Sequence, residues 1–318
     1  MKFTTARYEI EVDEERAEHV IDAVRTTSLQ AQGLYQFVTR EANAVQRYNI
    51  PSLVLRGDLR HQQWVYFTTM TDRREDSTRV WPSHVKLRAK YPRLYTAYAA
   101  TLKPATIESK LREFKVGSPG QSAQYWPRCA KTLFGELGGE PIRLYQRGKG
   151  LIDDVLAFKQ TSKGGDPIPG FGPKILSLLA LYYAELDLMP MPADAFPVDV
   201  HVQRFLISTG IVSGTGVIVN EQLERIARPL LCRVTKRLGI SRIEASHDIW
   251  FLGHYACTGC WRNAAIPELC PAYAKCGGAI DSKSYYKKGV WHLDRPRNPR
   301  GGDVQSVLPW TTPIQAVA

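Results

Sequence analysis

Apolar residues recur at helical spacing along most of this chain. Residues 13–25 place Val20, Ile21 and Val24 on one face, and Asp13 stands where a helix-capping residue would. Residues 174–186 are apolar on nearly every side, which predicts a helix buried all round. The same spacing predicts further helices over residues 64–81, 86–102, 107–114, 122–137, 151–159, 198–209, 221–238 and 243–256.

The alternation typical of a strand is clear near the start of the chain. Residues 3–12 set Tyr8, Ile10 and Val12 against polar neighbours, which predicts a short strand. The sequence contains no internal repeat, no low-complexity tract and no apolar run long enough to span a bilayer. We therefore expect an all-α protein with one short β element at its start.

The composition of the chain favours a polyanionic binding partner. The 318 residues carry a formal net charge of +11, which favours nucleic acid first and a membrane surface second as partners. The alternative is a soluble protein that is merely basic. The first five residues lack the apolar segment of a secretory signal, so a reducing compartment is expected. There, the clustering of four of the six cysteines predicts a metal site rather than disulfides.

Residues 167–204 carry the candidate chemistry. Gly170 and Gly172 flank Phe171, and two glycines at this spacing let the backbone turn tightly and approach a ligand closely. Pro173 suits the first position of the following helix, whose free N–H groups can bind a phosphate oxygen. The alternative is an ordinary turn between two helices, since many such turns contain glycine.

Lys174 falls in the first turn of that helix, and Asp199 follows 25 residues later. A partly buried amine at a helix start can serve as a nucleophile, or it can simply neutralise a phosphate. Asp199 lies in a largely apolar segment just before a helical pattern, so it caps the helix, does chemistry, or does both. His201 and Arg204 are expected to hydrogen-bond within the protein or to contact phosphate.

These stretches resemble the helix-hairpin-helix DNA glycosylase superfamily, which contains endonuclease III and the adenine and 8-oxoguanine glycosylases. Its members carry Leu-Pro-Gly-Val-Gly-x-Lys followed by Val-Asp-Thr-His-x-x-Arg. The matching stretches here are residues 168–174, Ile-Pro-Gly-Phe-Gly-Pro-Lys, and residues 198–204, Val-Asp-Val-His-Val-Gln-Arg. The resemblance implies Lys174 as a Schiff-base nucleophile and Asp199 as the essential carboxylate. It also implies DNA contacts from Gly170, Phe171, Gly172, Pro173, His201 and Arg204.

The chain departs from the family pattern in four places. The interval from the lysine to the aspartate is longer than in endonuclease III, and residues 187–197 look like an inserted loop. The run 161–166 before the hairpin is also long, Val200 replaces the usual threonine, and the cysteine spacing differs. The first two departures change loops near the pocket. The substrate can therefore differ from those of the family.

Four cysteines lie within 20 residues and can hold zinc or a 4Fe-4S cluster: Cys257, Cys260, Cys270 and Cys276. Residues 252–257 and the last interval resemble the iron–sulfur loop of endonuclease III, whereas the front half of the spacing is rearranged. The resemblance favours the 4Fe-4S cluster over zinc. The cluster would have a structural role and would direct Arg262 and Lys275 toward DNA. Cys129 and Cys232 are expected to be ordinary buried cysteines.

Two further segments are charged. Thr71, Asp72 and Arg73 lie on a predicted helix, and in the family a polar segment of an early barrel helix reaches into the DNA stack. The alternative for these residues is a solvated charged face. The tail after Cys276 carries six Lys or Arg against three Asp, with Tyr285, Tyr286 and Trp291 interleaved. It either follows a phosphate backbone or wraps over the core.

The resemblance implies a two-lobed helix-hairpin-helix DNA glycosylase fold with a metal-cluster loop. A helical barrel would span residues 60–197, a second lobe residues 198–276, a segment packing on that lobe residues 1–59, and a basic tail residues 277–318. The expected activity is that of a DNA glycosylase and AP lyase of the base-excision-repair type. It would flip a damaged or modified base out of double-stranded DNA. A monomer is expected, at the nucleoid in a prokaryotic cytoplasm or otherwise in a nucleus.

Two alternatives stay open. One is a transferase that modifies a base on a glycosylase-like scaffold and leaves the glycosidic bond intact. The other is a non-catalytic DNA-binding protein, against which the matching lysine and aspartate argue. The sequence does not identify the base, because pocket walls come from dispersed residues.

Overall fold

The computed structural model divides the chain into two compact units. Unit 1 comprises Met1–Arg40 and Val198–Ala318, and unit 2 comprises Glu41–Pro197. The structure describes residues 1–5, 7–37, 50–52, 54–72, 77–162, 164–258, 268–276 and 284–293. The sequence placed a boundary after residue 197 as well, but it began the helical barrel at residue 60, whereas unit 2 begins at Glu41.

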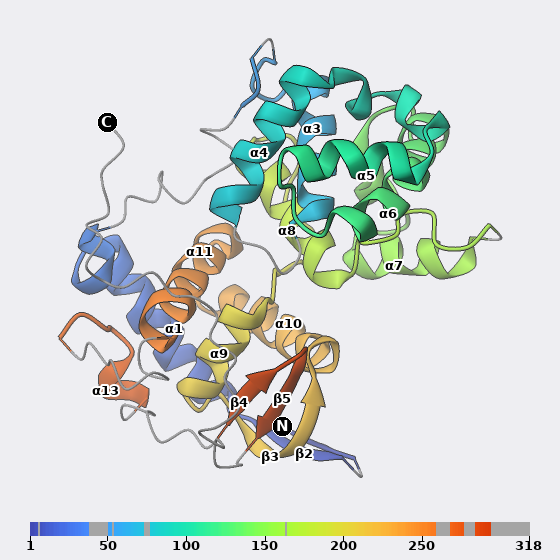
Figure 1. Cartoon of the computed structure of the whole chain (residues 1–318). Helices are drawn as coiled ribbons and strands as arrows, with labels where there is room; N and C mark the ends of the chain where they lie inside the picture. Colours follow the sequence, from blue (N-terminus) through green and yellow to red (C-terminus); the bar gives the residue numbers. More distant parts are fainter. Residues whose placement is uncertain are drawn as a thin grey trace. The chain divides into compact units, whose positions relative to one another are not determined.

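Helices dominate both units (Figure 1). Every predicted helical range contains part of a helix. The range 64–81, predicted as one helix, contains parts of two, α3 and α4. The Asp13 cap is confirmed, since its carboxylate accepts a hydrogen bond from the Arg16 N–H at 2.9 Å. No helix in the described part of the chain is long and apolar enough to cross a membrane. The helices are α1 (Glu14–Leu29), α3 (Leu59–Thr71), α4 (Ser77–Lys90), α5 (Pro104–Glu113), α6 (Pro119–Lys131), α7 (Ile152–Thr161), α8 (Pro173–Glu185), α9 (Val200–Ser208), α10 (Asn220–Arg237), α11 (Arg242–Leu252) and α13 (Tyr273–Cys276).

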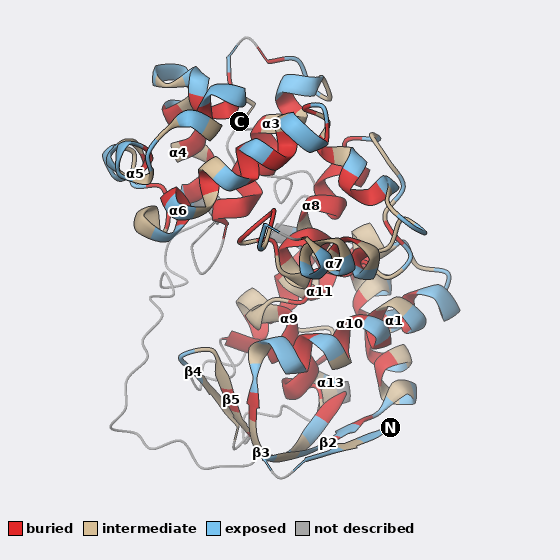
Figure 2. Cartoon of the chain, turned by 90° about the vertical axis from the view of Figure 1, so that its right-hand side faces the viewer, coloured by how far each residue is buried: buried red, intermediate tan, exposed pale blue. Residues whose placement is uncertain are grey.

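Aromatic side chains on α3, α4 and α6 build much of the core of unit 2. Phe67 stacks on Trp126 with ring centroids 4.8 Å apart, and Trp64 meets Trp81 edge-on at 5.1 Å. Helix α8 is buried along most of its length, as its apolar sequence predicts (Figure 2). Burial on nearly every side fixes the position of its first turn within unit 2.

The predicted inserted loop, residues 187–197, has a structural role in unit 2. Its Asp194 carboxylate accepts hydrogen bonds from the backbone N–H groups of Ile152 at 2.8 Å and Asp153 at 3.1 Å. These are first-turn donors of α7, which have no acceptor within the helix. Phe196 of the same loop is fully buried. The extra residues therefore stabilise the helix that precedes the hairpin.

The chain is mostly helical, as predicted, but a five-stranded antiparallel sheet in unit 1 makes its β content larger than the one short element expected. The strand order of the sheet is β1-β2-β3-β5-β4. The short β element at the start is confirmed, but the sequence analysis did not predict the other three strands. The strands are β1 (Lys2–Thr4), β2 (Tyr8–Val12), β3 (Val212–Val219), β4 (Tyr285–Lys287) and β5 (Val290–Leu293).

Strand β3 escapes prediction because its two glycines resemble a turn signal. Gly214 has a φ of 153° and Gly216 a φ of 96°. A Cβ at Gly214 would lie 2.1 Å from the carbonyl oxygen of Glu9, and one at Gly216 would lie 2.2 Å from that of Arg7. These glycines therefore let the neighbouring backbone approach closely enough to pair.

Part of the predicted tail belongs to this sheet. Strand β5 pairs with β3 on one side and with β4 on the other. Trp291 on β5 is fully buried, and its indole N–H donates to Oε1 of Gln203 at 2.6 Å. Trp291 is therefore a core residue rather than a base-stacking one. Residues 277–318 were predicted as a basic tail. The segment 284–293 of that tail instead belongs to the sheet of unit 1.

Candidate active site

A tight hairpin joins α7 to α8. The Phe171 N–H donates to the carbonyl oxygen of Ile168 at 3.2 Å, and Gly170 between them has a φ of 91°, which favours glycine. Gly172 precedes α8 in an extended conformation, and Pro173 takes the first helical position, as predicted. A Cβ at Gly172 would meet no atom within 4 Å, so the space beside this backbone is open within unit 2.

Side chains from neighbouring helices hold the hairpin in shape. Nζ of Lys159 donates to the carbonyl oxygens of Ile168, at 3.1 Å, and Phe171. Oγ1 of Thr132 donates to the carbonyl oxygen of Pro167 at 2.7 Å. These bonds satisfy carbonyls that a tight turn leaves without helical partners. Sequence reasoning missed Lys159, because no periodic pattern marks a lysine that bonds backbone 9 and 12 residues later.

Phe171 is not a side-chain ligand for DNA. It is fully buried and stacks on Tyr66 with ring centroids 4.6 Å apart. Its side chain is therefore not accessible to DNA, and a contact through its backbone stays a prediction. The apolar ring instead anchors the tip of the hairpin in the core of unit 2.

Lys174 lies in the first turn of α8 and is half-buried. Its Nζ donates to the backbone carbonyl oxygen of Asp72, 3.4 Å away. Asp72 is the residue at which α3 ends, where carbonyl groups have no helical donor. The structure thus brings the predicted nucleophile to the C-terminal end of α3.

For Thr71 and Asp72 the structure contradicts both predicted alternatives, a segment that reaches into DNA and a solvated charged face. Thr71 is fully buried, and 3% of Asp72 is exposed. Oγ1 of Thr71 donates to the carbonyl oxygen of Thr68 and contacts Nε2 of His84 at 2.7 Å. The end of α3 is therefore part of the core, and Arg73 lies outside the described residues.

His84 forms the centre of a buried polar chain behind the end of α3. Its Nδ1 lies 2.7 Å from the Tyr95 hydroxyl, and its ring stacks on Trp126. Because the Thr71 hydroxyl proton is directed at Thr68, we assign the imidazole proton to Nε2 and the acceptor role to Nδ1. Burial lowers the pKa of His84 to about 3, so the ring is neutral at ordinary pH.

Asp199 caps α9, as the sequence predicted. Its Oδ1 accepts hydrogen bonds from the backbone N–H groups of His201 at 2.9 Å and Val202 at 3.0 Å. Its Oδ2 accepts a third from the indole N–H of Trp250 at 2.9 Å. The half-buried carboxylate is therefore held by donors on both of its oxygens.

His201 and Arg204 belong to an internal network of unit 1. The guanidinium of Arg204 donates to Oγ1 of Thr258 and contacts Nδ1 of His201 at 3.2 Å. Nε2 of His201 lies 3.3 Å from Nδ1 of His254. Since 7% of Arg204 is exposed, its predicted contact with phosphate is corrected to a structural role. His201 is half-buried and stays a candidate for such a contact.

The structure describes part of the predicted cysteine loop. Cys257 is buried at the end of a π-helical turn after α11, whereas Cys270 and Cys276 are half-buried. Cys260 and Arg262 lie outside the described residues, and Lys275 belongs to α13. Among the residues that are described, no three His, Cys, Asp or Glu side chains are grouped as metal ligands. Elsewhere, Cys129 is buried as expected, whereas Cys232 is only half-buried.

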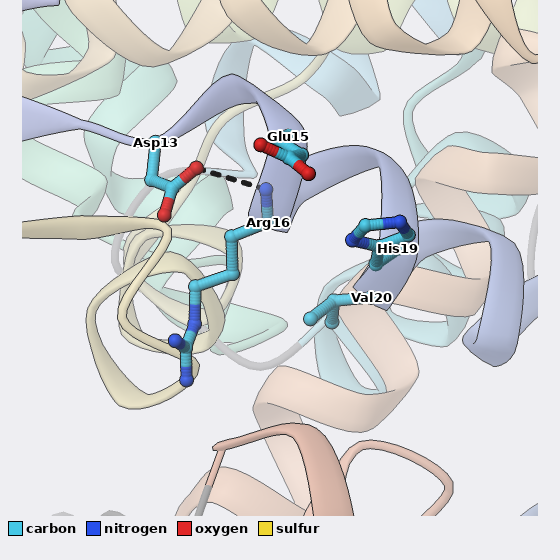
Figure 3. A pocket seen from close by; sticks show the side chains of 5 residues that line it. All are labelled: Asp13, Glu15, Arg16, His19 and Val20. Carbon is cyan, nitrogen blue, oxygen red and sulfur yellow. Dashed lines mark hydrogen bonds between the residues drawn. The ribbon is translucent and has the colours of Figure 1, made fainter.

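A separate pocket lies on α1 and contains none of the predicted site residues. Asp13, Glu15, Arg16, His19 and Val20 line it (Figure 3). The Asp13 carboxylate is already engaged in capping α1. All the lining residues come from the first turns of this helix and the residue before it. We assign no function to this pocket.

No protein-family model matches this chain, and no curated protein matches it either. The interpretation of the site therefore depends on its own geometry and chemistry.

Proposed function

We propose that this protein is a DNA glycosylase with an associated AP-lyase activity, acting on a damaged or modified base in double-stranded DNA. The observation that carries the proposal is the glycine hairpin that leads directly into α8 and sets Lys174 on its first turn. A phosphate bound at this helix start would bring the neighbouring sugar to the amine. The second group that the proposal uses, the carboxylate of Asp199, belongs to unit 1.

The surroundings of Lys174 suit a nucleophile. Its partner among the described residues is a carbonyl oxygen, and 3.4 Å is long for a hydrogen bond. A carboxylate partner would hold the group far more strongly. The amine can therefore leave this contact at modest cost when a sugar is presented to it.

The reaction has two stages. In the first, the lone pair of Lys174 Nζ forms a bond to C1′ of the flipped nucleotide, and the base leaves with the electron pair of the glycosidic bond. The nitrogen then loses a proton and the ring oxygen gains one as the sugar opens, which leaves an imine at C1′. In the second, C2′ loses a proton and the 3′ phosphate departs, so the strand is cut.

Asp199 acts as a fixed negative charge in this scheme. Hydrogen bonds to an ionised carboxylate favour the ionised form, and three N–H groups donate to this one. A fixed anion stabilises the positive charge that develops on the sugar as the base leaves. Because the donors hold the carboxylate beforehand, little reorganisation accompanies the reaction.

A 4Fe-4S cluster, with zinc as the alternative, is proposed from the four clustered cysteines and their resemblance to the iron–sulfur loop of endonuclease III. Cys257, Cys260, Cys270 and Cys276 would supply the thiolates. The described residues do not bring three metal ligands together, so the geometry adds no support to the cluster. No step of the reaction is derived through the metal, whose role would be to order the loop.

A panel of DNA duplexes, each with one defined lesion, tests the proposed function. Incubation with the full chain should release a free base from at least one duplex and cut the strand without added alkali. Strand cutting that requires alkali would contradict the lyase stage only. An altered base that stays attached to its sugar would overturn the proposal in favour of a base-modifying transferase.

A further inference from the structure

The second oxygen of the Asp199 carboxylate has a partner that the cap does not require. The cap uses Oδ1, which accepts the N–H groups of His201 and Val202. Oδ2 accepts the indole N–H of Trp250 from α11, 51 residues further along the chain. Since one oxygen satisfies the helix, the Trp250 bond serves to fix the rotation of the carboxylate about its Cβ–Cγ bond.

The Trp250 ring is itself held in place. It stacks on the His254 ring with centroids 4.8 Å apart and an interplanar angle of 9°. The His201 ring meets it edge-on at 5.8 Å. A half-buried indole would otherwise rotate among several rotamers and donate to water. The two histidine rings restrict this rotation, so the N–H is aimed at Oδ2 before any ligand binds.

A glycine sets the position of the stacked pair. A Cβ at Gly253 would lie 2.1 Å from the carbonyl oxygen of His201, so the turn after α11 can approach α9 this closely only with glycine. His254 follows directly. Nη1 of Arg204 lies 3.2 Å from Nδ1 of His201, and Nε2 of His201 lies 3.3 Å from Nδ1 of His254. The contacts between α9 and the turn after α11 therefore give the Trp250 ring one orientation.

We propose that Trp250 is a positioning residue for Asp199, which fixes the carboxylate as an oriented, ionised group. This inference rests on the proposed function. The inference also makes the proposed mechanism more specific, because Asp199 then acts as a stationary negative charge and does not carry a proton during base release.

The variant Trp250→Phe tests the inference, since phenylalanine retains a flat ring against His254 but has no N–H. We expect single-turnover base release to fall about 10-fold, the scale of one hydrogen bond to a charged group. The acidic limb of the pH–rate profile should move to higher pH, because a lost donor disfavours the ionised carboxylate. Trp291→Phe is the matched control. It removes an indole N–H that donates to the Gln203 side chain on α9 rather than to the Asp199 carboxylate.

A double-mutant cycle separates positioning from a general structural role. In the Asp199→Asn background, Trp250→Phe should cause almost no further loss of rate, because its effect passes through the carboxylate. An equal loss in both backgrounds would overturn the inference. So would an unshifted pH profile in Trp250→Phe, or an equal shift in Trp291→Phe.

Failure of this inference differs from failure of the proposed function. If wild-type protein releases base and Trp250→Phe matches it, only the positioning role is wrong. If wild-type protein releases no base from any duplex, the function is wrong. The Asp199 carboxyl carbon can still be titrated by NMR, and an unchanged midpoint in Trp250→Phe would then overturn the positioning role.

Discussion

The Lys174 side chain donates a hydrogen bond to the backbone carbonyl oxygen of Asp72, 102 residues away in the sequence. The contact joins the first turn of α8 to the last turn of α3, and the His84 network lies directly behind it. It holds the amine in place while no sugar is bound. Because the acceptor is a backbone atom, its position depends on the packing of α3 and on no single side chain.

Lys174→Gln should abolish covalent capture of DNA. If Lys174 forms an imine, borohydride will reduce it to a stable protein–DNA adduct with wild-type protein, and glutamine has no amine to form one. Lys103→Gln is a suitable control, because Lys103 is an exposed lysine of the same unit. Gel electrophoresis of trapped adducts measures the result. Equal trapping by Lys174→Gln would move the nucleophile to another residue.

Gly172→Ala should weaken DNA binding more than folding. The added methyl group meets no protein atom, and the φ of −81° suits any residue, so the cost is that of a poorer helix cap, about 1 kcal/mol. A phosphate seated against this backbone would be displaced, and we expect affinity for undamaged duplex to fall at least about 10-fold. Gly164→Ala adds an equally unobstructed methyl group ahead of the hairpin. Fluorescence titrations that show equal affinities for both variants would contradict a phosphate at the hairpin.

Asp199→Asn should separate binding from chemistry. The amide keeps one carbonyl oxygen, which can serve either the cap or the Trp250 indole but not both. Stability should therefore fall by about 1 kcal/mol, while lesion DNA still binds. Single-turnover base release should fall at least about 100-fold, because the proposed stabilising negative charge is lost. Thermal melting and single-turnover kinetics measure the two effects, and near-normal turnover would leave Asp199 as a cap alone.

His84 should make unit 2 less stable in acid. Burial lowers its pKa to about 3 in the folded protein from an ordinary value of 6.5, so the unfolded chain binds the proton more readily. Its contribution to the free energy of unfolding is fully present above pH 6.5 and is lost as the pH falls toward about 3, at up to about 1.4 kcal/mol per unit. Urea denaturation of wild type and His84→Gln at several pH values measures the difference. Parallel pH dependences in the two proteins would contradict a buried neutral His84.

The four cysteines should bind one iron–sulfur cluster. Protein purified without oxygen should be brown and should contain iron together with acid-labile sulfide. Cys270→Ser removes one of the proposed thiolates and should lower the iron content, whereas Cys232→Ser, outside the cluster, should not. Stoichiometric zinc without sulfide would identify a zinc loop instead.

The helices and their caps were predictable because they depend on local order along the chain. Apolar spacing located α1, α8 and α9, and the Asp13 and Asp199 caps stand directly before their helices. The hairpin was equally local, since its glycines and proline adjoin one another in sequence. Such features need no knowledge of distant residues.

The remaining features depend on contacts between distant segments. Strand β3 contains glycines that would weaken an isolated strand, and it is stable because β2, some 200 residues earlier, pairs against them. The hydrogen bond from Trp250 to Asp199 joins residues 51 positions apart in the sequence. From the sequence, an apolar indole ring is interpreted as a core residue rather than as a hydrogen-bond donor. Phe171 and Arg204 were assigned to DNA from the motif, whereas their burial is decided by Tyr66 and Thr258. No periodic pattern encodes these pairings.

The sheet of unit 1 also imposes an order on biosynthesis. Strands β1 and β2 leave the ribosome first, but β5, which lies against β3, is complete only when Leu293 has been added. All of unit 2, with its hairpin and Lys174, is synthesised in the interval. A nascent or truncated chain ending before β5 would expose the unpaired edge of β3, a template for aggregation and a target for proteases. Completion of the sheet therefore depends on synthesis of the chain as far as Leu293.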